Sequence, residues 1–349
     1  MTTQASSTAR LTPDLARLTD PGVAESAVAS GVVSPRLYVR EEETPLPSQV
    51  VAYRTRLSAC IVAMRPHHWT KNVLLFVPLI LAHDFSLDSL LRASTAFAAF
   101  CLCASAIYLI NDIHDIDTDR CHPNKCFRPI AAGEMSVLQG IFLAAGLLVS
   151  GLVVGVVMGS WLFLGTLVLY LALTSLYSFG LKRQMVVDVV LLANLYTLRI
   201  VAGGFASGIP VSEWLLAFSM FLFLSLAFAK RYAELARLAD AGHTACNSRG
   251  YVVADLSLIE NLGPTSGYLA VLVFALYIHS EAVKQLYTNT WALWPICILL
   301  LYWITRLWFL AKRRLLAEDP LVFAIRDLVS LAIATVAGAL LVTASITLH

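Results

Sequence analysis

Charged side chains are scarce in this chain. Of its 349 residues, 14% are Asp, Glu, Lys or Arg, whereas 58% are hydrophobic. Soluble domains carry about a quarter charged residues, so the composition excludes an ordinary soluble domain and favours a polytopic helical membrane protein. The formal net charge of +2 is uninformative as a sum, and no nucleic-acid partner is expected.

Three further features are missing. The seven cysteines show no disulfide framework, so we interpret them as reduced packing residues. No apolar core follows a basic start, which excludes a secretory signal peptide. The apolar runs also lack the period-two alternation of a membrane β-barrel. Residues 1–56 are rich in Ser, Thr, Pro and Ala and predict a mostly disordered cytoplasmic tail. Residues 57–349 are then the transmembrane domain.

Long apolar runs are what the chain has in abundance. Nine stretches are candidates for spanning helices, at about residues 72–84, 90–110, 137–157, 161–179, 186–206, 212–229, 265–280, 291–310 and 328–348. The first and seventh are short. The predicted fold class is therefore an all-α, polytopic bundle of nine transmembrane helices in a lipid bilayer.

The distribution of Lys and Arg predicts the orientation. Basic residues gather in the loops after the even-numbered spans: Arg120, Lys125, Arg128, Lys182, Arg183, Lys230, Arg231, Arg237, Arg249, Lys312, Arg313 and Arg314. The opposite loops hold almost none. Because basic loops remain cytoplasmic, we expect the N-terminus and the polar loops inside the plasma membrane and the C-terminus outside.

The densest polar stretch follows directly on the second apolar run. Asp112, Asp115 and Asp119 are spaced by three and four residues, so a helix would place them on one face. Like charges beside hydrocarbon are costly unless cations lie among them. Mg²⁺ takes carboxylate oxygens and leaves positions for substrate phosphates. The stretch predicts a magnesium–diphosphate site, with Lys125 and Arg128 on the free phosphate oxygens.

Ionisable residues also accompany later spans. Asp188 and Arg199 lie about three turns apart on the fifth span, and an ionisable group inside a span is a functional candidate. Arg199 could instead neutralise Asp188 or an aspartate of the polar stretch. Lys182 is a candidate phosphate contact. Lys230 and Arg231 are also candidates, although two cations at a helix end equally satisfy the positive-inside rule.

The pattern Asn111-Asp112-x-x-Asp115-x-x-x-Asp119 resembles the signature of the UbiA family of intramembrane prenyltransferases. The resemblance covers roughly residues 60–349 and is most similar to the decaprenyl-phosphate phosphoribosyltransferases. Further segments that carry it are Arg65-Pro66 with Trp69 and Lys71-Asn72, His122-Pro123 with Lys125 and Phe127-Arg128-Pro129, Phe179-Gly180-Leu181-Lys182, Leu198-Arg199 with Ala202-Gly203-Gly204, and Lys230-Arg231-Tyr232-Ala233-Glu234-Leu235. It implies a nine-helix bundle around a central cavity, with polar caps on the cytoplasmic side.

The sequence departs from the ordinary prenyltransferases in one loop. They carry a second motif, of the Asp-x-x-x-Asp type, after the sixth span. Here that loop offers Lys230, Arg231 and Glu234, with Asp240 further on. Fewer carboxylates and more cations suit a donor with a phosphate beyond its diphosphate, such as phosphoribosyl diphosphate.

The resemblance therefore implies a Mg²⁺-dependent phosphoribosyltransferase. It would move a 5-phosphoribosyl group from phosphoribosyl diphosphate to a polyprenyl phosphate and release diphosphate, for synthesis of an arabinosyl-lipid donor of the cell envelope. Asp112, Asp115 and Asp119 would be catalytic and hold the metal, with Asn111 as a further ligand. Substrate contacts would come from polar side chains of the same face: Lys71, Asn111, Lys125, Arg128, Tyr177, Lys182, Asp188, Arg199, Lys230 and Arg231.

Two alternatives remain open. One is a prenyltransferase that joins an isoprenoid diphosphate to an aromatic or other acceptor. The other is a lipid transporter or lipid-binding membrane protein, although no internal repeat of the kind found in transporters is evident. The sequence leaves the polyprenyl length and the oligomeric state open, and a homo-oligomer is compatible with it.

Overall fold

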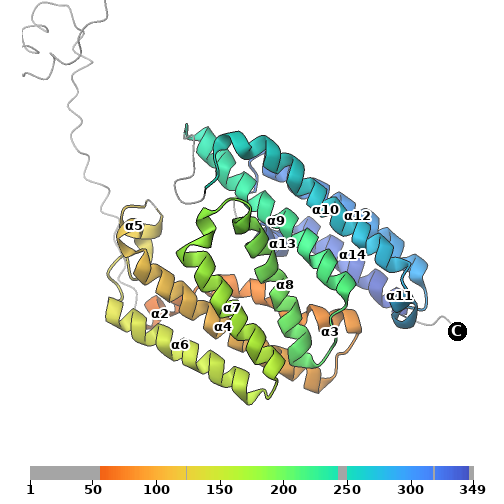
Figure 1. The fold of residues 1–349 in the computed structure, drawn as a ribbon, viewed down its shortest axis with the longest axis horizontal. Helices are drawn as coiled ribbons and strands as arrows, with labels where there is room; N and C mark the ends of the chain where they lie inside the picture. The colour runs from red at the N-terminus through yellow and green to blue at the C-terminus, as the bar shows by residue number, and fades with distance from the viewer. Residues whose placement is uncertain (1–55, 123, 243–249, 317–318, 346–349) are drawn as a thin grey trace, which may run out of the picture. The chain divides into compact units, whose positions relative to one another are not determined.

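A computed structural model describes residues 56–122, 124–242, 250–316 and 319–345, and every regular element in these ranges is a helix (Figure 1). The longer helices are α4 (Leu87–His114), α6 (Val137–Val157), α7 (Trp161–Phe179), α8 (Val187–Ser207), α9 (Glu213–Asp240), α10 (Leu256–Ile278), α12 (Trp294–Lys312) and α14 (Leu328–Ser345). The shorter elements, with η marking 3-10 helices, are α2 (Arg56–Met64), η3 (Pro66–Phe76), α3 (Val77–Ala82), α5 (Ile116–Arg120), η4 (Lys125–Phe127), η5 (Leu181–Arg183), η6 (Val253–Asp255), α11 (Glu281–Leu286), η7 (Thr290–Leu293) and α13 (Pro320–Arg326). The predicted tail lies outside the described residues, apart from Arg56.

The eight longer helices are all long and apolar enough to cross a membrane. They coincide with eight of the nine predicted spans, so the prediction of an all-helical, multi-pass membrane protein is confirmed. The first predicted span, residues 72–84, instead falls across η3 and α3, which have 11 and 6 residues. The six cysteines among the described residues are free; Cys101, Cys103 and Cys297 are buried, whereas Cys121 is exposed and is not a packing residue.

The break between η3 and α3 has a local cause. Pro78 has no amide hydrogen, so it cannot form the α-helical bond to the carbonyl of Leu74. The N–H of Val77 bonds to that carbonyl instead, with the tighter spacing of a 3-10 helix. A 3-10 run of this length is unusual, and it carries the polar side chains from His67 to Asn72.

Serine residues begin four of the spanning helices. Ser86, Ser136, Ser160 and Ser212 precede α4, α6, α7 and α9, and each hydroxyl accepts the backbone N–H three residues further on. The first N–H groups of a helix have no partner within it. Serine at this position supplies one, which fixes where each helix starts.

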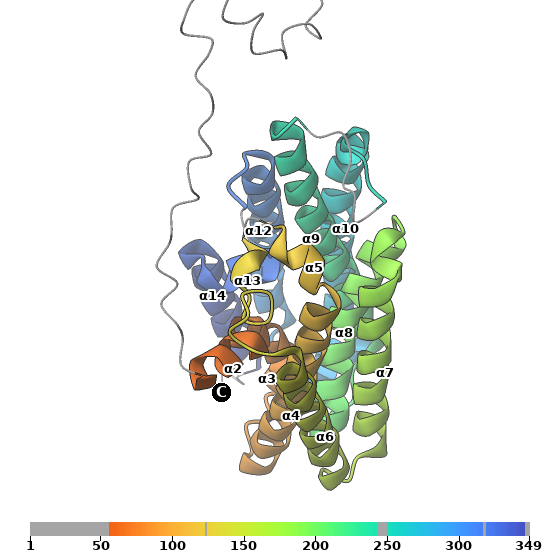
Figure 2. The same cartoon turned by 90° about the vertical axis from the view of Figure 1, so that its left-hand side faces the viewer.

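Helices α4 and α8 form the interior of the bundle. In an apolar stretch of 18 residues within each of these helices, 61% is buried, whereas the corresponding share for α14 is 11%. Helix α8 lies between α7 and α9 in both views (Figures 1 and 2). A Cβ atom on Gly203 of α8 would lie 2.0 Å from the carbonyl oxygen of Leu75 in η3. Only glycine permits this approach, which brings the polar side chains of η3 beside those of α8.

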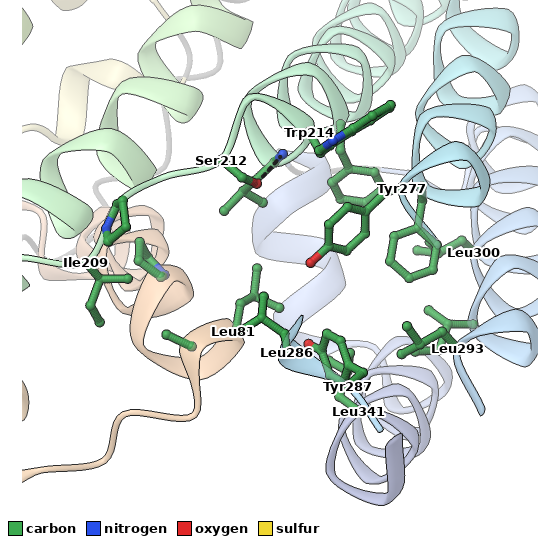
Figure 3. Close-up of a pocket in the computed structure, with 17 residues that line it drawn as sticks. Leu81, Ile209, Ser212, Trp214, Tyr277, Leu286, Tyr287, Leu293, Leu300 and Leu341 are labelled. Atoms are coloured by element: carbon green, nitrogen blue, oxygen red, sulfur yellow. Dashed lines mark hydrogen bonds between the residues drawn. The ribbon is translucent and has the colours of Figure 1, made fainter. Parts of the chain in front are cut away.

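A mostly apolar cavity of about 450 Å³ lies among α3, α9, α10, α11, α12 and α14 (Figure 3). Its walls include Pro78, Leu215, Phe218, Phe274 and Leu341. The cavity reaches the last residues of α3 and α11. Helices α5 and α11 lie at opposite ends of the bundle (Figure 1), so the cavity lies toward the end away from the predicted carboxylate site.

Candidate functional site

The predicted carboxylate stretch does not continue as one helix. Helix α4 ends at His114, Asp115 is its C-cap with φ −94° and ψ 10°, and α5 begins at Ile116. Asp112 in the last turn of α4 and Asp119 in α5 are both buried. The break changes the direction of the chain, so the spacing of three and four residues does not by itself set the geometry.

Arg128 brings two of the three carboxylates together. Its Nη1 lies 3.1 Å from Asp112 Oδ1 and also donates to Asp119 Oδ2. Arg65 Nη2 lies 2.5 Å from the same oxygen of Asp112. We call Asp112 and Asp119 the open carboxylate pair, because the Arg128 side chain between them is 24% exposed. Asp115 is half-buried and forms no ion pair within the described ranges.

The open carboxylate pair suits a divalent cation. The two carboxylates converge on one nitrogen atom, so a cation already occupies the space between them. Their oxygen donors are those that Mg²⁺ prefers, with phosphate oxygens as further ligands. A group of three His, Cys, Asp or Glu side chains arranged around one metal position is not found among the described residues. Asp112 and Asp119 are therefore the two predicted metal ligands that the structure brings together, and the roles of Asp115 and Asn111 stay predictions.

The other predicted residues of this region lie apart from the pair. Asn111 donates from Nδ2 to Ser178 Oγ over 3.1 Å. Lys125 in η4 is exposed, and Lys182 in η5 is half-buried. Neither lysine forms an ion pair with any residue that the structure describes.

A second pair of carboxylates surrounds Arg231. Arg231 Nε lies 2.6 Å from Asp188 Oδ2, and its Nη1 contacts Glu234. Tyr177 donates its hydroxyl to Asp188 Oδ1 over 2.9 Å and accepts from Arg231 Nη2 at 3.4 Å. The side chains of Arg231 and Asp188 are 1% and 0% exposed. We call these four residues the sealed ion cluster.

Two lysines from distant elements share one aspartate. Lys71 Nζ of η3 and Lys230 Nζ of α9 each lie 2.9 Å from Asp319 Oδ2. The hydroxyl of Tyr196 in α8 lies 3.3 Å from Asp319 Oδ1. Burial alone would raise the pKa of the Asp319 carboxyl. The positive charges of Lys230 and Lys71 outweigh this effect and hold the pKa of Asp319 well below its usual range. We call Lys71 and Lys230 the lysine pair.

Arg199 lies beside the lysine pair. Its Nε donates to Asn72 Oδ1 over 3.0 Å and its Nη2 to the Tyr170 hydroxyl over 3.1 Å. The Tyr170 ring centroid is 4.8 Å from the guanidinium carbon. The suggestion that Arg199 neutralises Asp188 is wrong, because Asp188 pairs with Arg231. Within the described ranges, no carboxylate forms an ion pair with Arg199.

Arg65, the N-cap of η3, and residues of η3 connect the open carboxylate pair to the lysine pair. Arg65 adopts the left-handed conformation, with φ 54°, and its guanidinium lies 5.3 Å from the Tyr108 ring centroid. The His68 ring lies 5.0 Å from the same ring. Burial, followed by the charge of Lys71 and other nearby cations, lowers the pKa of His68 to about 3. His68 is therefore neutral at pH 7, and the positive charge along η3 comes from Arg65 and Lys71.

Sequence reasoning missed Asp319, Tyr196 and the direct role of Arg65. One local signal was available for Asp319, since an aspartate directly before proline is typical of a helix start. Asp319 does cap α13, and its Oδ1 accepts the N–H of Leu321. Nothing local indicated that its side chain would meet Lys71 and Lys230.

The comparisons with known proteins agree on the family. The model of the UbiA prenyltransferase family matches residues 73–328. Nodulation protein NoeC of Azorhizobium caulinodans is 37% identical over 279 residues, which cover 79% of this chain and 89% of NoeC. Protein y4nM of Sinorhizobium fredii is 39% identical over 268 residues, and the match spans only 51% of that relative's length.

A third relative is named for a reaction. Decaprenyl-phosphate phosphoribosyltransferase of Mycolicibacterium smegmatis is 41% identical over 189 residues, covering 51% of this chain and 58% of that enzyme. A UbiA homologue of Archaeoglobus fulgidus, solved with GPP and Mg²⁺, has the same fold, with a TM-score of 0.60 at 17% identity over 81% of this chain and 99% of the other. Sequence and fold together show that the chain belongs to the UbiA prenyltransferase family.

Proposed function

We propose that this protein transfers a 5-phosphoribosyl group from phosphoribosyl diphosphate to the phosphate of a polyprenyl phosphate, with Mg²⁺ as cofactor. Members of its family are transferases, and the Mycolicibacterium enzyme, which matches half of the chain, is named for this reaction. The NoeC-like relatives match more of the chain, but their names carry no substrate. One observation carries the proposal. A carboxylate pair suited to a metal is connected through Arg65 and η3 to a group of cations, the half-buried Lys71 and Lys230 and the buried Arg199.

The charges match two phosphorylated substrates. The diphosphate of the donor needs a metal, and carboxylates are its natural ligands. The 5-phosphate of the donor and the phosphate of the acceptor need cations. Lys71, Lys230 and Arg199 supply these from partly or fully buried positions, where charge–charge attraction is stronger than in bulk water.

The reaction follows from this arrangement. An oxygen of the acceptor phosphate attacks C1 of the ribose, the bond from C1 to the diphosphate oxygen breaks, and diphosphate leaves with the electron pair. The acceptor oxygen is already an anion, so no general base is required. Mg²⁺ held by Asp112 and Asp119 would supply charge stabilisation for the leaving group. Arg128, already at the carboxylates, would bind the phosphate oxygens, with Lys125 on the free oxygens and Asn111 on the metal or the ribose hydroxyls.

The hydrocarbon chain of the acceptor requires an apolar path. The cavity among α3, α9, α10 and α14 supplies one within the bundle, away from the carboxylates (Figure 3). With the basic loops on the cytoplasmic side, phosphoribosyl diphosphate would enter from the cytoplasm and the lipid from the plasma membrane. The product would serve synthesis of an arabinosyl-lipid donor.

The test uses purified full-length protein with Mg²⁺, a polyprenyl phosphate and radiolabelled phosphoribosyl diphosphate. We expect label to enter the organic phase, and EDTA or Asp119→Ala to stop it. Consumption of an isoprenoid diphosphate with an aromatic acceptor, and no lipid-linked label, would instead establish the prenyltransferase alternative. Uptake into proteoliposomes without any metal-dependent product would favour the transporter.

A further inference from the structure

Asp319 is held firmly at the lysine pair. It caps α13, with Pro320 at the first helical position, and its Oδ1 accepts the N–H of Leu321 over 3.2 Å. Its Oδ2 receives both lysine ammoniums at 2.9 Å. A carboxylate fixed by its own helix places Lys71 and Lys230 side by side, although they come from η3 and α9.

The lysine pair retains capacity for another anion. Each ammonium has three N–H donors, and Asp319 takes one from each. Lys71, Lys230 and Arg199 contribute three positive charges and Asp319 one negative charge, which leaves +2. The lysines are 12% and 27% exposed, and excess buried charge is costly. A phosphate monoester, at about −1.5 to −2 near pH 7, balances it.

The surroundings distinguish a lipid phosphate from a sugar phosphate. The lysine pair belongs to the two segments that continue into the apolar cavity. Pro78 of the cavity wall follows η3 along the chain, and Phe218 lies on α9, about 18 Å of helix from Lys230. A phosphate bound at the lysine pair thus has an apolar wall on both of its supporting segments. The open carboxylate pair contacts Arg65, before η3 begins.

We propose that Lys71 and Lys230, positioned by Asp319, form the subsite for the phosphate of the lipid acceptor. The diphosphate of the donor then belongs to the open carboxylate pair. The identity of the acceptor rests on the proposed function. Binding at the lysine pair needs neither metal nor donor, so it is measurable apart from the reaction.

The first experiment measures the Kd of farnesyl phosphate for full-length protein in detergent with EDTA, by calorimetry. Farnesol, which lacks the phosphate, is the ligand control. We expect Lys230→Gln and Lys71→Gln to weaken binding by about ten- to a hundredfold, as for loss of a charge-assisted hydrogen bond. Asp119→Asn should leave the Kd within about twofold. Unchanged binding by both lysine variants, or equal weakening by Asp119→Asn, would overturn the assignment.

The second experiment tests the positioning role of Asp319 through the pH dependence of the same Kd. Burial disfavours the Lys71 ammonium, but Asp319 raises the pKa of Lys71 above its ordinary value. Without that carboxylate, burial and neighbouring cations act unopposed. Titratable and charged groups that face the lysine pair are His68, Tyr108, Tyr170, Tyr196, Arg199 and Asp319.

As the pH rises, we expect Asp319→Asn to lose farnesyl phosphate binding about one pH unit or more below the pH at which the wild type loses it. Asp327→Asn is the matched control, because Asp327 also accepts an N–H at the start of a helix and pairs with a cation, Arg306. If both variants shift the pH profile equally, or neither does, Asp319 has no positioning role. Asp319→Glu, which keeps the charge, should retain the wild-type profile.

The two proposals fail in different ways. If label is transferred but the lysine variants raise KM for phosphoribosyl diphosphate and leave farnesyl phosphate binding intact, the subsite assignment is wrong and the reaction stands. If farnesyl phosphate binds as predicted but no phosphoribosyl transfer occurs, the subsite stands and the donor is a different molecule.

Discussion

Two arginines in this bundle each bridge a pair of carboxylates, but in opposite surroundings. Arg128 joins Asp112 and Asp119, and its side chain is 24% exposed. Arg231 joins Asp188 and Glu234, and its side chain is 1% exposed. The two arginines therefore differ in accessibility, although Glu234 of the sealed ion cluster is 27% exposed and the carboxylates of the open pair are 3% and 2% exposed.

The exposed arginine is the one that can exchange its partners. Arg128 can leave the open carboxylate pair for a phosphate oxygen while a metal takes its place. Arg231 is enclosed by Asp188, Glu234 and Tyr177, and breaking a buried pair is strongly destabilising. We therefore interpret the open pair as a reaction site and the sealed ion cluster as a support for it. Each prediction below tests that distinction.

The largest effect is expected at the centre of the sealed ion cluster. Arg231→Leu leaves Asp188 buried without its cation, and we expect a loss of about 3–5 kcal/mol in the free energy of unfolding. Thermal unfolding in detergent measures it as a lower Tm. Arg231→Lys, which keeps the charge but not the planar guanidinium, should have a Tm between those of the wild type and Arg231→Leu. A wild-type Tm for Arg231→Leu would contradict the supporting role.

The next largest effect is catalytic. Asp119→Asn removes one carboxylate of the open pair but keeps its size, and we expect label transfer to the lipid to slow by about 10²–10³-fold. The Tm should remain close to that of the wild type, because Asp112 keeps Arg65 and Arg128 as partners. Equal losses of activity and Tm would make Asp119 a structural residue.

A smaller catalytic effect is expected for Arg128→Gln. The guanidinium is partly exposed, but Asp119 is only 2% exposed and loses its cation, whereas Asp112 keeps Arg65, so we expect a loss of about 1–3 kcal/mol in the free energy of unfolding. Loss of its contact with the donor diphosphate should lower kcat/KM for phosphoribosyl diphosphate by about ten- to a hundredfold. Steady-state assays at varied donor concentration measure this. Arg128→Lys should recover part of the activity, and a fall in Tm as large as that of Arg231→Leu would contradict the interpretation of an open pair.

The smallest effect is expected for Tyr177→Phe. The change removes one hydroxyl that donates to Asp188 at 2.9 Å, while the ion pair of Asp188 with Arg231 remains. We expect a loss of about 1 kcal/mol in the free energy of unfolding, read as a modest fall in Tm. An effect as large as that of Arg231→Leu would show that the hydroxyl, and not the arginine, holds the cluster together.

Most of the membrane architecture could be predicted, because the length of an apolar run is a local property of the sequence. The exception, η3 with α3, follows from Pro78, whose missing N–H favours the tighter helix. The break at Asp115 was not expected, since the spacing of the aspartates suits a continuous helix.

The ion pairs of the site were less predictable, because their partners are far apart in the chain. Arg65 and Asp112 are separated by 47 residues, and Lys71 and Asp319 by 248. Residue types indicated that phosphate-binding cations would gather, and Lys71 and Lys230 do meet. Only tertiary structure shows that they do so on Asp319, and that Arg231 rather than Arg199 pairs with Asp188.

The separation of Lys71 and Asp319 has a consequence for biogenesis. A nascent chain enters the bilayer from its N-terminal side, so η3 is inserted long before the ribosome reaches α13. Seven of the eight long apolar helices precede Asp319 in the chain, and a polypeptide cut before that residue still holds them. Its lysines would face the interior without their carboxylate, at a cost that hydrocarbon surroundings make large. A segment that is synthesised late thus decides whether the earlier η3 is stable, so the lysine pair is balanced only after translation has passed Asp319.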